Sequence, residues 1–172
     1  MKYFKHRTSI IDKNCKIGKN TKIWHWSHIS ENVKIGENCI IGQNVFIGNN
    51  VTIGNNVKLG EHLLILEGNN IQHNAQIGDN SFLWSSNHIG HSSIIGKNVF
   101  ISSNVTISGC TSIGDNSFVG VGSTFANDIE IGKFNYFGNG CNITTNTKNA
   151  FNLTLSATAP LTIDAAVAQK TI

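Results

Sequence analysis

Two histidines lie three residues apart in the segment 84–93, which reads WSSNHIGHSS. Histidine changes charge near neutral pH, so His88 or His91 could act as a general base that takes a proton from a hydroxyl or an amine. Such a base is most useful beside hydrogen-bond donors that stabilise a developing oxyanion. The segment therefore has the side chains for group transfer, and their use depends on how the fold positions them.

A repeat of six residues organises most of the chain. Each sixth residue from Ile11 to Ile143 is Ile, Leu, Val or Phe, which gives 23 consecutive positions without an insertion. The next residue is often Gly, and the third residue after the apolar one is Asn, Gly or Asp in 17 of the 23 hexads. Six is three times the strand period and does not fit a helix, and Asn and Gly accept left-handed turns. Each hexad therefore predicts a short strand followed by a turn.

Three hexads close one triangular coil of 18 residues, and successive coils stack at the strand spacing of about 4.8 Å. The sequence thus predicts an all-β fold, a parallel β-helix of about seven to eight coils over residues 11–148. Residues 1–10 are expected to cap the first coil. Residues 149–172 leave the period, and we expect an irregular strand and a short helix near 163–171 that cover the last coil.

The length of the coil predicts which side chains stack on the histidines. His91 lies in a turn, with His73 one coil earlier and Gly109 one coil later. This arrangement would set a base beside an open backbone N–H, although a solvated surface histidine is the alternative. His88, on the other side of Ile89, is a second candidate for the base. Asn87 lies one full coil after Asn69, and we expect a buried amide ladder, because a buried amide must be paired.

Six hexads break the turn rule, and departures from local rules tend to mark functional sites. They are Trp26, His62, Ser86, Ser92, Cys110 and Phe134. Two of the six fall in the segment 84–93, which is the densest departure. A second cluster, IWHWSHI at 23–29, contains Trp24, His25 and Trp26. The indoles could stack on a base or sugar ring, or both could pack against residues 1–10 or a neighbouring subunit.

Composition narrows the class of protein. The net charge of +3 argues against a nucleic-acid or anionic-membrane protein, which usually shows a concentrated basic patch. No apolar run approaches the ~20 residues of a membrane span, and the N-terminus has no signal-peptide pattern, so we expect a cytoplasmic protein. No two of the four cysteines are separated by one full coil, which argues against disulfides. Cys110 is the only outward candidate for a nucleophile, and this role is not favoured.

The repeated I-G-x-N-small-x pattern resembles the hexapeptide-repeat acyltransferases, which are left-handed parallel β-helices and usually homotrimers. The left hand comes from this resemblance, because crossover connections are generally right-handed. The stretch NHIGHSSIIGKNVFISS resembles the sialic acid O-acetyltransferases and the UDP-4-amino-sugar N-acetyltransferases. The front half, with IWHWSHI, resembles the UDP-2,3-diamino-sugar-acid N-acetyltransferases.

The resemblance implies an acetyl-CoA-dependent acetyltransferase that acts on a sugar or nucleotide-sugar in bacterial surface polysaccharide biosynthesis, such as that of O-antigen, capsule or lipopolysaccharide. His91 matches the general base of these relatives, and Ser92 stands where many have Asp or Glu. The homotrimer would form its active sites between subunits. The resemblance assigns CoA contacts to Gly109, Ser103, Gly120, Gly122 and Ala126. The acceptor contacts that we expect are Trp84, Asn87, His73, Trp24 and His25.

Two other functions remain open on the sequence. One is a non-catalytic β-helix scaffold. The other is a γ-type carbonic anhydrase, which needs three histidines around Zn²⁺, two of them five residues apart. The close histidine pairs in this chain are three residues apart, so we expect no metal.

Overall fold

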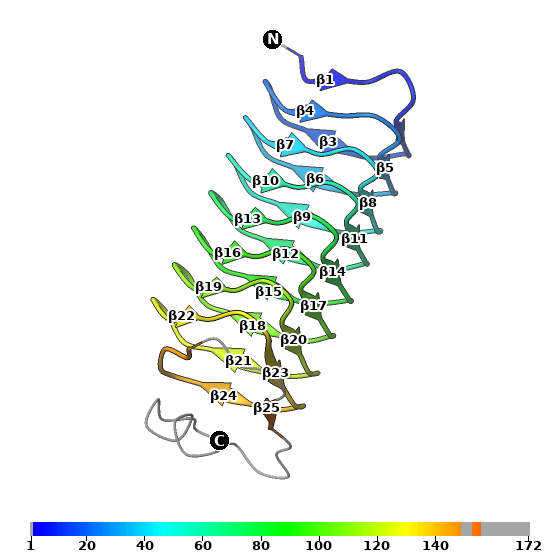
Figure 1. The fold of residues 1–172 in the computed structure, drawn as a ribbon. Coiled ribbons are helices and arrows are strands. Elements are labelled where there is room, and N and C mark those ends of the chain that lie inside the picture. The colour runs from blue at the N-terminus through cyan, green and yellow to red at the C-terminus, as the bar shows by residue number, and fades with distance from the viewer. Residues whose placement is uncertain (1, 149–152, 156–172) are drawn as a thin grey trace.

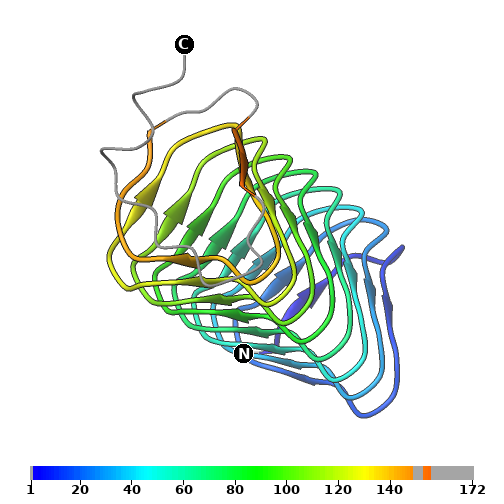
Figure 2. The same ribbon diagram turned by 90° about the horizontal axis from the view of Figure 1, so that it is seen from below.

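The computed structural model describes residues 2–148 and 153–155, and over them the chain winds as a parallel β-helix (Figure 1). Each coil contributes one short strand to each of three parallel sheets. Along the axis the coils superpose as triangles, with β1 (Phe4–Lys5) and β25 (Leu153–Leu155) at opposite ends of the stack (Figures 1 and 2). The predicted fold, a left-handed parallel β-helix of seven to eight coils, is confirmed, since the chain makes about eight turns.

Each sheet runs the length of the helix. The first sheet contains β1 (Phe4–Lys5), β4 (Lys22–Ile23), β7 (Ile40–Ile41), β10 (Lys58–Leu59), β13 (Gln76–Ile77), β16 (Ile94–Ile95), β19 (Ser112–Ile113) and β22 (Glu130–Ile131). The second contains β2 (Ile10–Ile11), β5 (His28–Ile29), β8 (Phe46–Ile47), β11 (Leu64–Ile65), β14 (Phe82–Leu83), β17 (Phe100–Ile101), β20 (Phe118–Val119), β23 (Asn135–Phe137) and β25 (Leu153–Leu155). The third contains β3 (Lys16–Ile17), β6 (Lys34–Ile35), β9 (Thr52–Ile53), β12 (Asn70–Ile71), β15 (His88–Ile89), β18 (Thr106–Ile107), β21 (Thr124–Phe125) and β24 (Asn142–Ile143).

The predicted register holds along the whole helix. Ile71 pairs with Ile89, and Ile89 pairs with Ile107. Even β25 keeps the offset, since Phe137 pairs with Leu155. A residue and its counterpart one coil later therefore lie directly over one another.

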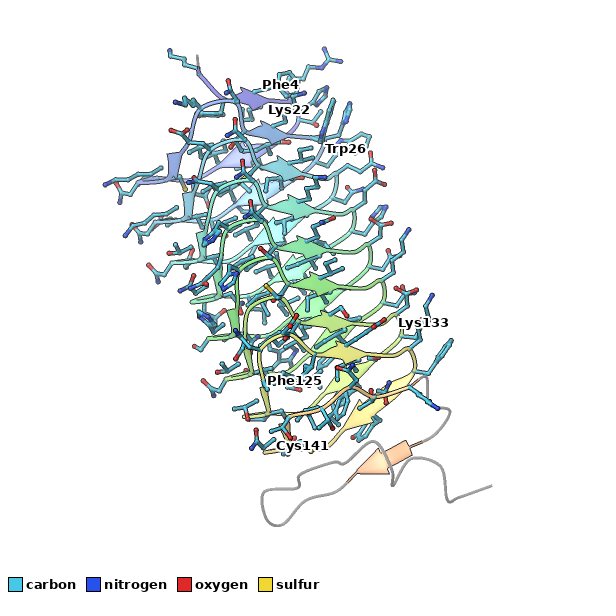
Figure 3. All side chains as sticks on the ribbon, turned by 90° about the vertical axis from the view of Figure 1, so that its left-hand side faces the viewer. Phe4, Lys22, Trp26, Phe125, Lys133 and Cys141 are labelled. Atoms are coloured by element: carbon cyan, nitrogen blue, oxygen red, sulfur yellow. The ribbon has the colours of Figure 1, made fainter. Side chains whose placement is uncertain are left out.

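The apolar residue of each hexad fills the interior of the triangle. Ile65, Ile89 and Ile107 have no exposed surface, and Phe125 and Phe137 close the core towards the C-terminal end, where Figure 3 marks Phe125. The residues four positions later, such as Val105, are buried as well. Cys39 and Cys141 occupy such positions, and all four cysteines are free thiols.

Three corners connect the sheets. We call the turns after the first, second and third sheets corner 1, corner 2 and corner 3. In every hexad from Asn14 to Gly140 the corner residue has a left-handed φ, which explains the preference for Asn and Gly. The exceptions adopt it too, with φ of 53° at Trp26, 56° at His62 and 57° at Cys110. These side chains accept a backbone strain of about 1–2 kcal/mol each.

The outer face of the second sheet carries a wall of aromatic rings that the sequence analysis missed. Phe82, Phe100, Phe118 and Tyr136 stack in order, with centroids 5.1, 5.2 and 4.7 Å apart and planes within 10°. Each of these residues stands directly before an inward residue of the second sheet, and successive ones are 18 residues apart in the sequence. The helix expected near 163–171 lies outside the described residues.

Candidate functional site

His91 lies on corner 3 between two neighbours that fix its ring. On one side His73 stacks on it, with centroids 5.5 Å apart and planes 10° apart. On the other side the imidazole lies over Gly109, where an added Cβ would be 2.4 Å from Nε2 and 2.7 Å from Cε1. Only glycine at 109 leaves room for the ring in this position. The predicted stack of His73, His91 and Gly109 is therefore present in the fold.

The backbone next to His91 has open donors. At several other corners, the N–H of the equivalent residue donates to an Asn or Asp side chain one coil later, as Glu37 donates to Asn55 Oδ1 at 2.8 Å. Gly109 has no side chain with which to cap the N–H of His91. The N–H of Gly109 also donates to no group in the described part of the chain. An anionic oxygen near His91 would thus find an uncapped backbone donor.

A ladder of asparagines on corner 3 stops where this site begins. Asn20, Asn38, Asn56 and Asn74 are linked in order by side-chain hydrogen bonds of 3.1, 3.3 and 3.1 Å. Ser92 and Cys110 take the next two positions. Both side chains are smaller than that of Asn.

Cys110 is a neighbour of His91 that sequence reasoning did not assign. Its Sγ lies 4.0 Å from His91 Nδ1, and its backbone N–H donates to the carbonyl of His91 at 2.8 Å. The relatives named above often have a carboxylate after the base, and here a thiol is the polar group nearest that ring nitrogen. The register of the coils places residue 110 over Ser92, but only the orientation of the His91 ring brings the thiol beside Nδ1.

His88 lies apart from His91, on β15 of the third sheet rather than on a corner. It is half-buried between Asn70 and Thr106 in the outer row of that sheet. The two candidate bases therefore face different surroundings. The outer row of the third sheet is polar along its length.

Asn87 and Asn69 form the predicted buried ladder. Asn87 is 2% exposed, and its backbone N–H donates to Asn69 Oδ1 at 3.0 Å. Both side-chain amides donate to the carbonyl of Trp84, at 2.7 and 2.8 Å, and Asn87 Oδ1 accepts from the N–H of Val105 at 2.8 Å. Asn87 thus fixes the turn that presents Trp84, which is 45% exposed on corner 2, and its own amide is inside the core.

The residues predicted to contact CoA divide between two corners. Gly109 and Ala126 lie on corner 3, whereas Ser103, Gly120 and Gly122 lie on corner 2. These two corners are the two edges of the third sheet. At Gly122 φ is +69° and an added Cβ would meet nothing within 4 Å, so this glycine serves the turn and leaves an open surface.

Trp24 and His25 lie away from the other candidates, on corner 1 near the N-terminal end. His25 lies between three and four coils before His91, which is about 17 Å along the axis. The ring of His25 lies 3.7 Å from that of His6, and Trp24 contacts Phe4 with centroids 5.6 Å apart. Trp24 thus packs against residues 1–10, which was one of the predicted alternatives, and His25 contacts the same segment.

Two of the four ion pairs in the described chain lie on corner 1. Lys97 Nζ lies 2.8 Å from Asp79, and Lys133 Nζ lies 2.7 Å from Asp115. Hydrogen bonds from these lysines lower the pKa of Asp79 and of Asp115, with smaller help from backbone donors. On corner 2 the hydroxyl of Ser85 donates to Glu67 at 2.6 Å and lowers the pKa of that carboxyl.

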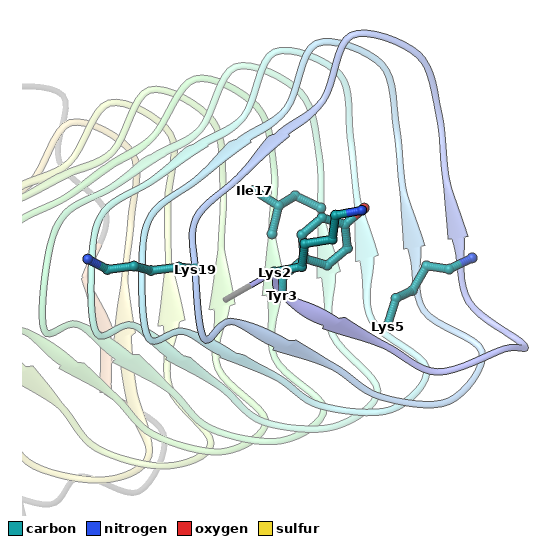
Figure 4. Close-up of a pocket in the computed structure, with 5 residues that line it drawn as sticks. All are labelled: Lys2, Tyr3, Lys5, Ile17 and Lys19. Atoms are coloured by element: carbon teal, nitrogen blue, oxygen red, sulfur yellow. The ribbon is translucent and has the colours of Figure 1, made fainter.

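Two hollows open on the surface, and His91 lines neither of them. A shallow groove of about 350 Å³ runs over the first sheet, lined by residues that include Gly60, Gly78 and Ile94. A wider hollow of about 510 Å³ opens at the N-terminal end (Figure 4). Among the described residues, no three His, Cys, Asp or Glu side chains gather as metal ligands would.

The coil period, the three parallel sheets and the left-handed corner residues define a hexapeptide-repeat, left-handed β-helix protein. The chain belongs to the family of the GMPPB C-terminal domain, whose model matches residues 23–113, more than half of the chain. A second model, the hexapeptide repeat of succinyl-transferase, matches residues 110–133. A comparison with curated proteins found no match.

Solved structures share the fold. The UDP-N-acetylglucosamine acyltransferase of Francisella novicida is 21% identical with a TM-score of 0.68, over 86% of this chain and 61% of that one. The UDP-N-acetylglucosamine O-acyltransferase of Moraxella catarrhalis is 20% identical with a TM-score of 0.67, over 86% and 65%. The chain thus spans less than two-thirds of the length of either enzyme. In the residues that the structure describes, no helix is long and apolar enough to cross a membrane.

Proposed function

We propose that the chain is an acetyl-CoA-dependent acetyltransferase that acts on a sugar or nucleotide-sugar. One observation carries the proposal: the ring of His91 lies over Gly109, beside a backbone N–H that donates to no group in the described chain. A base and an oxyanion donor are the two elements that acyl transfer from a thioester requires. The match to a hexapeptide repeat of succinyl-transferase directly after this site is consistent with the same chemistry.

The reaction would proceed by direct transfer. His91 takes the proton of an acceptor hydroxyl or amine as the oxygen or nitrogen attacks the thioester carbonyl carbon of acetyl-CoA. The N–H of Gly109 donates to the oxyanion of the tetrahedral intermediate. The intermediate collapses with loss of the CoA thiolate, and the proton held by His91 neutralises that leaving group. The same base serves O- and N-acetylation.

The donor site requires a second copy of the chain in this proposal. Corner 3, with His91, Gly109 and Ala126, and corner 2, with Ser103 and Gly122, are separated by the third sheet of one chain. In a homotrimer whose third sheets face a common axis, corner 3 of one copy meets corner 2 of the next. CoA would lie between these corners, and Trp84 on corner 2 would reach the acceptor from the neighbouring copy.

This function belongs in the cytoplasm, where acetyl-CoA is available, and in the synthesis of bacterial surface polysaccharide. The acceptor contacts that we propose are Trp84, His73 and His88, with Asn87 acting through the turn of Trp84. His88 is the alternative base, since it lies on the third sheet that would face the neighbouring copy.

The test is a thiol-release assay with acetyl-CoA and a panel of amino sugars, sialic acids and UDP-amino sugars. We expect His91→Ala to lower kcat at least about 100-fold, as removal of a general base does. His62→Asn is the matched control, because His62 is exposed on corner 1 and Asn is the usual residue at that position. If His91→Ala kept full activity and His88→Ala were inactive, His88 and not His91 would be the general base.

A non-catalytic scaffold is the second candidate. The family model that matches residues 23–113 is named for its place in another protein and assigns no activity to the domain. If the chain released no thiol from acetyl-CoA with any acceptor and did not bind acetyl-CoA, the scaffold role would replace the enzyme.

A further inference from the structure

The charge of the chain is divided unevenly along the helix axis. Residues 1–34 contain eight Lys or Arg and two Asp or Glu, a net charge of +6, whereas residues 35–172 contain five and eight, a net charge of −3. The small overall charge therefore hides a concentrated basic region. Because the chain completes one coil before it starts the next, this region forms the first two coils at the N-terminal end.

The basic side chains surround that end as a collar. Lys22 extends from the first sheet, Lys13 from corner 2, Lys16 and Lys34 from the third sheet, and Lys19 from corner 3. All five are exposed. Lys19 is paired with Glu37 at 3.3 Å, and in the described chain the other four make no ion pair. With the exposed Arg7 on corner 1, basic side chains stand at all three corners and on two of the three sheets, which suits a flat anionic surface perpendicular to the axis.

Exposed apolar side chains lie at the same end. Among the large hydrophobic side chains that the described chain exposes, five of eleven precede the third coil. They are Tyr3 at 38%, Phe4 at 46%, Ile10 at 56%, Trp24 at 39% and Trp26 at 61%. Figure 3 shows Phe4, Lys22 and Trp26 at this end, and Figure 4 shows Lys2, Tyr3 and Ile17 among the residues that line its hollow. Trp26 keeps its indole outside although its left-handed φ of 53° favours Asn there.

We propose that the N-terminal end of the helix binds the surface of an anionic lipid bilayer. Lysine and arginine near such a surface are attracted to the acidic headgroups, and Trp, Tyr and Phe prefer the boundary between headgroups and hydrocarbon. Trp24 and Trp26 lie on the second coil, about 5 Å behind the first coil, a depth that the interfacial layer accommodates. The helix would stand on the membrane, with corner 3 and His91 three to four coils above it.

A single-stranded nucleic acid fits this end less well. Such a ligand tracks along one charged groove and stacks its bases on ring faces. Here the cations lie on two sheets and at all three corners rather than along one groove, and Ile10 has no role in binding a base. The same full-length protein can distinguish the two ligands.

The experiment is sedimentation of the full chain with phosphatidylcholine vesicles that contain either no anionic lipid or about 30% phosphatidylglycerol. We expect binding to the anionic vesicles that is at least tenfold tighter and that weakens as salt is raised. Lys22→Gln should weaken it about fivefold. Lys58→Gln is the matched control, because Lys58 extends from the same sheet two coils further along, and it should change binding less than twofold.

Trp26→Asn separates binding from folding. Asn suits the left-handed corner, so the variant should unfold at the same or a higher temperature. Loss of an indole that buries about 60 Å² in the interface should weaken vesicle binding about tenfold. Brominated lipids should quench Trp24 and Trp26 but not Trp84, which lies more than three coils further along the axis.

No difference between the two kinds of vesicle, or quenching of Trp84 alone, would overturn the proposal. Binding of a 20-nucleotide RNA with no binding to vesicles would replace it with a nucleic-acid site. None of these outcomes depends on acetyl transfer, so they test the membrane surface independently of the proposed enzyme.

Discussion

Replacement of Gly109 by Ala should displace the His91 ring and lower activity while it changes the free energy of unfolding only slightly. The added methyl would meet three atoms of the imidazole at 2.4, 2.7 and 2.8 Å, whereas ordinary contacts begin near 3.4 Å. The ring must therefore move by about 1 Å. A displacement of that size from the productive geometry costs about 100-fold in rate. The backbone at 109 has no left-handed φ, so Ala itself fits the turn.

The stability of this variant should change little. The imidazole is half-buried and can tilt outward, at about 0.5–1.5 kcal/mol for a strained rotamer. Thiol release should thus fall about 100-fold in kcat, while urea unfolding shifts by less than about 1.5 kcal/mol. Gly140→Ala is the control with the opposite pattern, since its φ is +69° and its methyl would meet nothing within 4 Å. It should lose about 1–2 kcal/mol and keep full activity. An active Gly109→Ala enzyme would refute the reasoning.

Three further predictions concern the core, the surface charge and the assembly. Asn87→Leu leaves the buried Val105 N–H without its acceptor and should destabilise the chain by about 1–3 kcal/mol, as urea unfolding would measure; an unchanged midpoint would contradict the ladder. The lowered pKa of Asp115 adds stability that is present above its ordinary pKa of 3.8 and is lost as the pH falls through its folded value. Because this carboxyl is on the surface, wild type should exceed Asp115→Asn by at most about 0.5 kcal/mol at pH 7 and by nothing near pH 2. Light scattering should give three times the chain mass of 18.7 kDa, with Thr106→Arg on the third sheet giving monomers and Gln76→Arg on the first sheet leaving the trimer intact.

Much of the fold was predictable because one local rule repeats without an insertion. Inward residues such as Ile89, the left-handed corners and the register of the coils all follow from hexad spacing. The stack of His73, His91 and Gly109 also follows, since register alone brings these residues together. The contact of Cys110 with His91 required the orientation of the ring, which periodicity does not specify.

Other features depended on properties that vary within the repeat. The aromatic wall of Phe82 and Phe100 uses the outward position of each hexad, where any residue satisfies the strand, so the repeat gives no signal there. The collar was missed because the net charge averages over the chain, whereas the coils separate its two ends in space. Trp24 and His25, like the segment 84–93, are Trp and His residues in hexads that break the turn rule. They lie on another corner, and counting residues in steps of 18 would have indicated this from the sequence.

Corner 3 should bind an acetyl donor, and calorimetric titration of the wild-type chain with acetyl-CoA measures that binding. We expect micromolar affinity near one site per chain, and weaker binding when Gly109 carries a methyl group. No heat of binding at millimolar acetyl-CoA would contradict it and leave the β-helix as a scaffold.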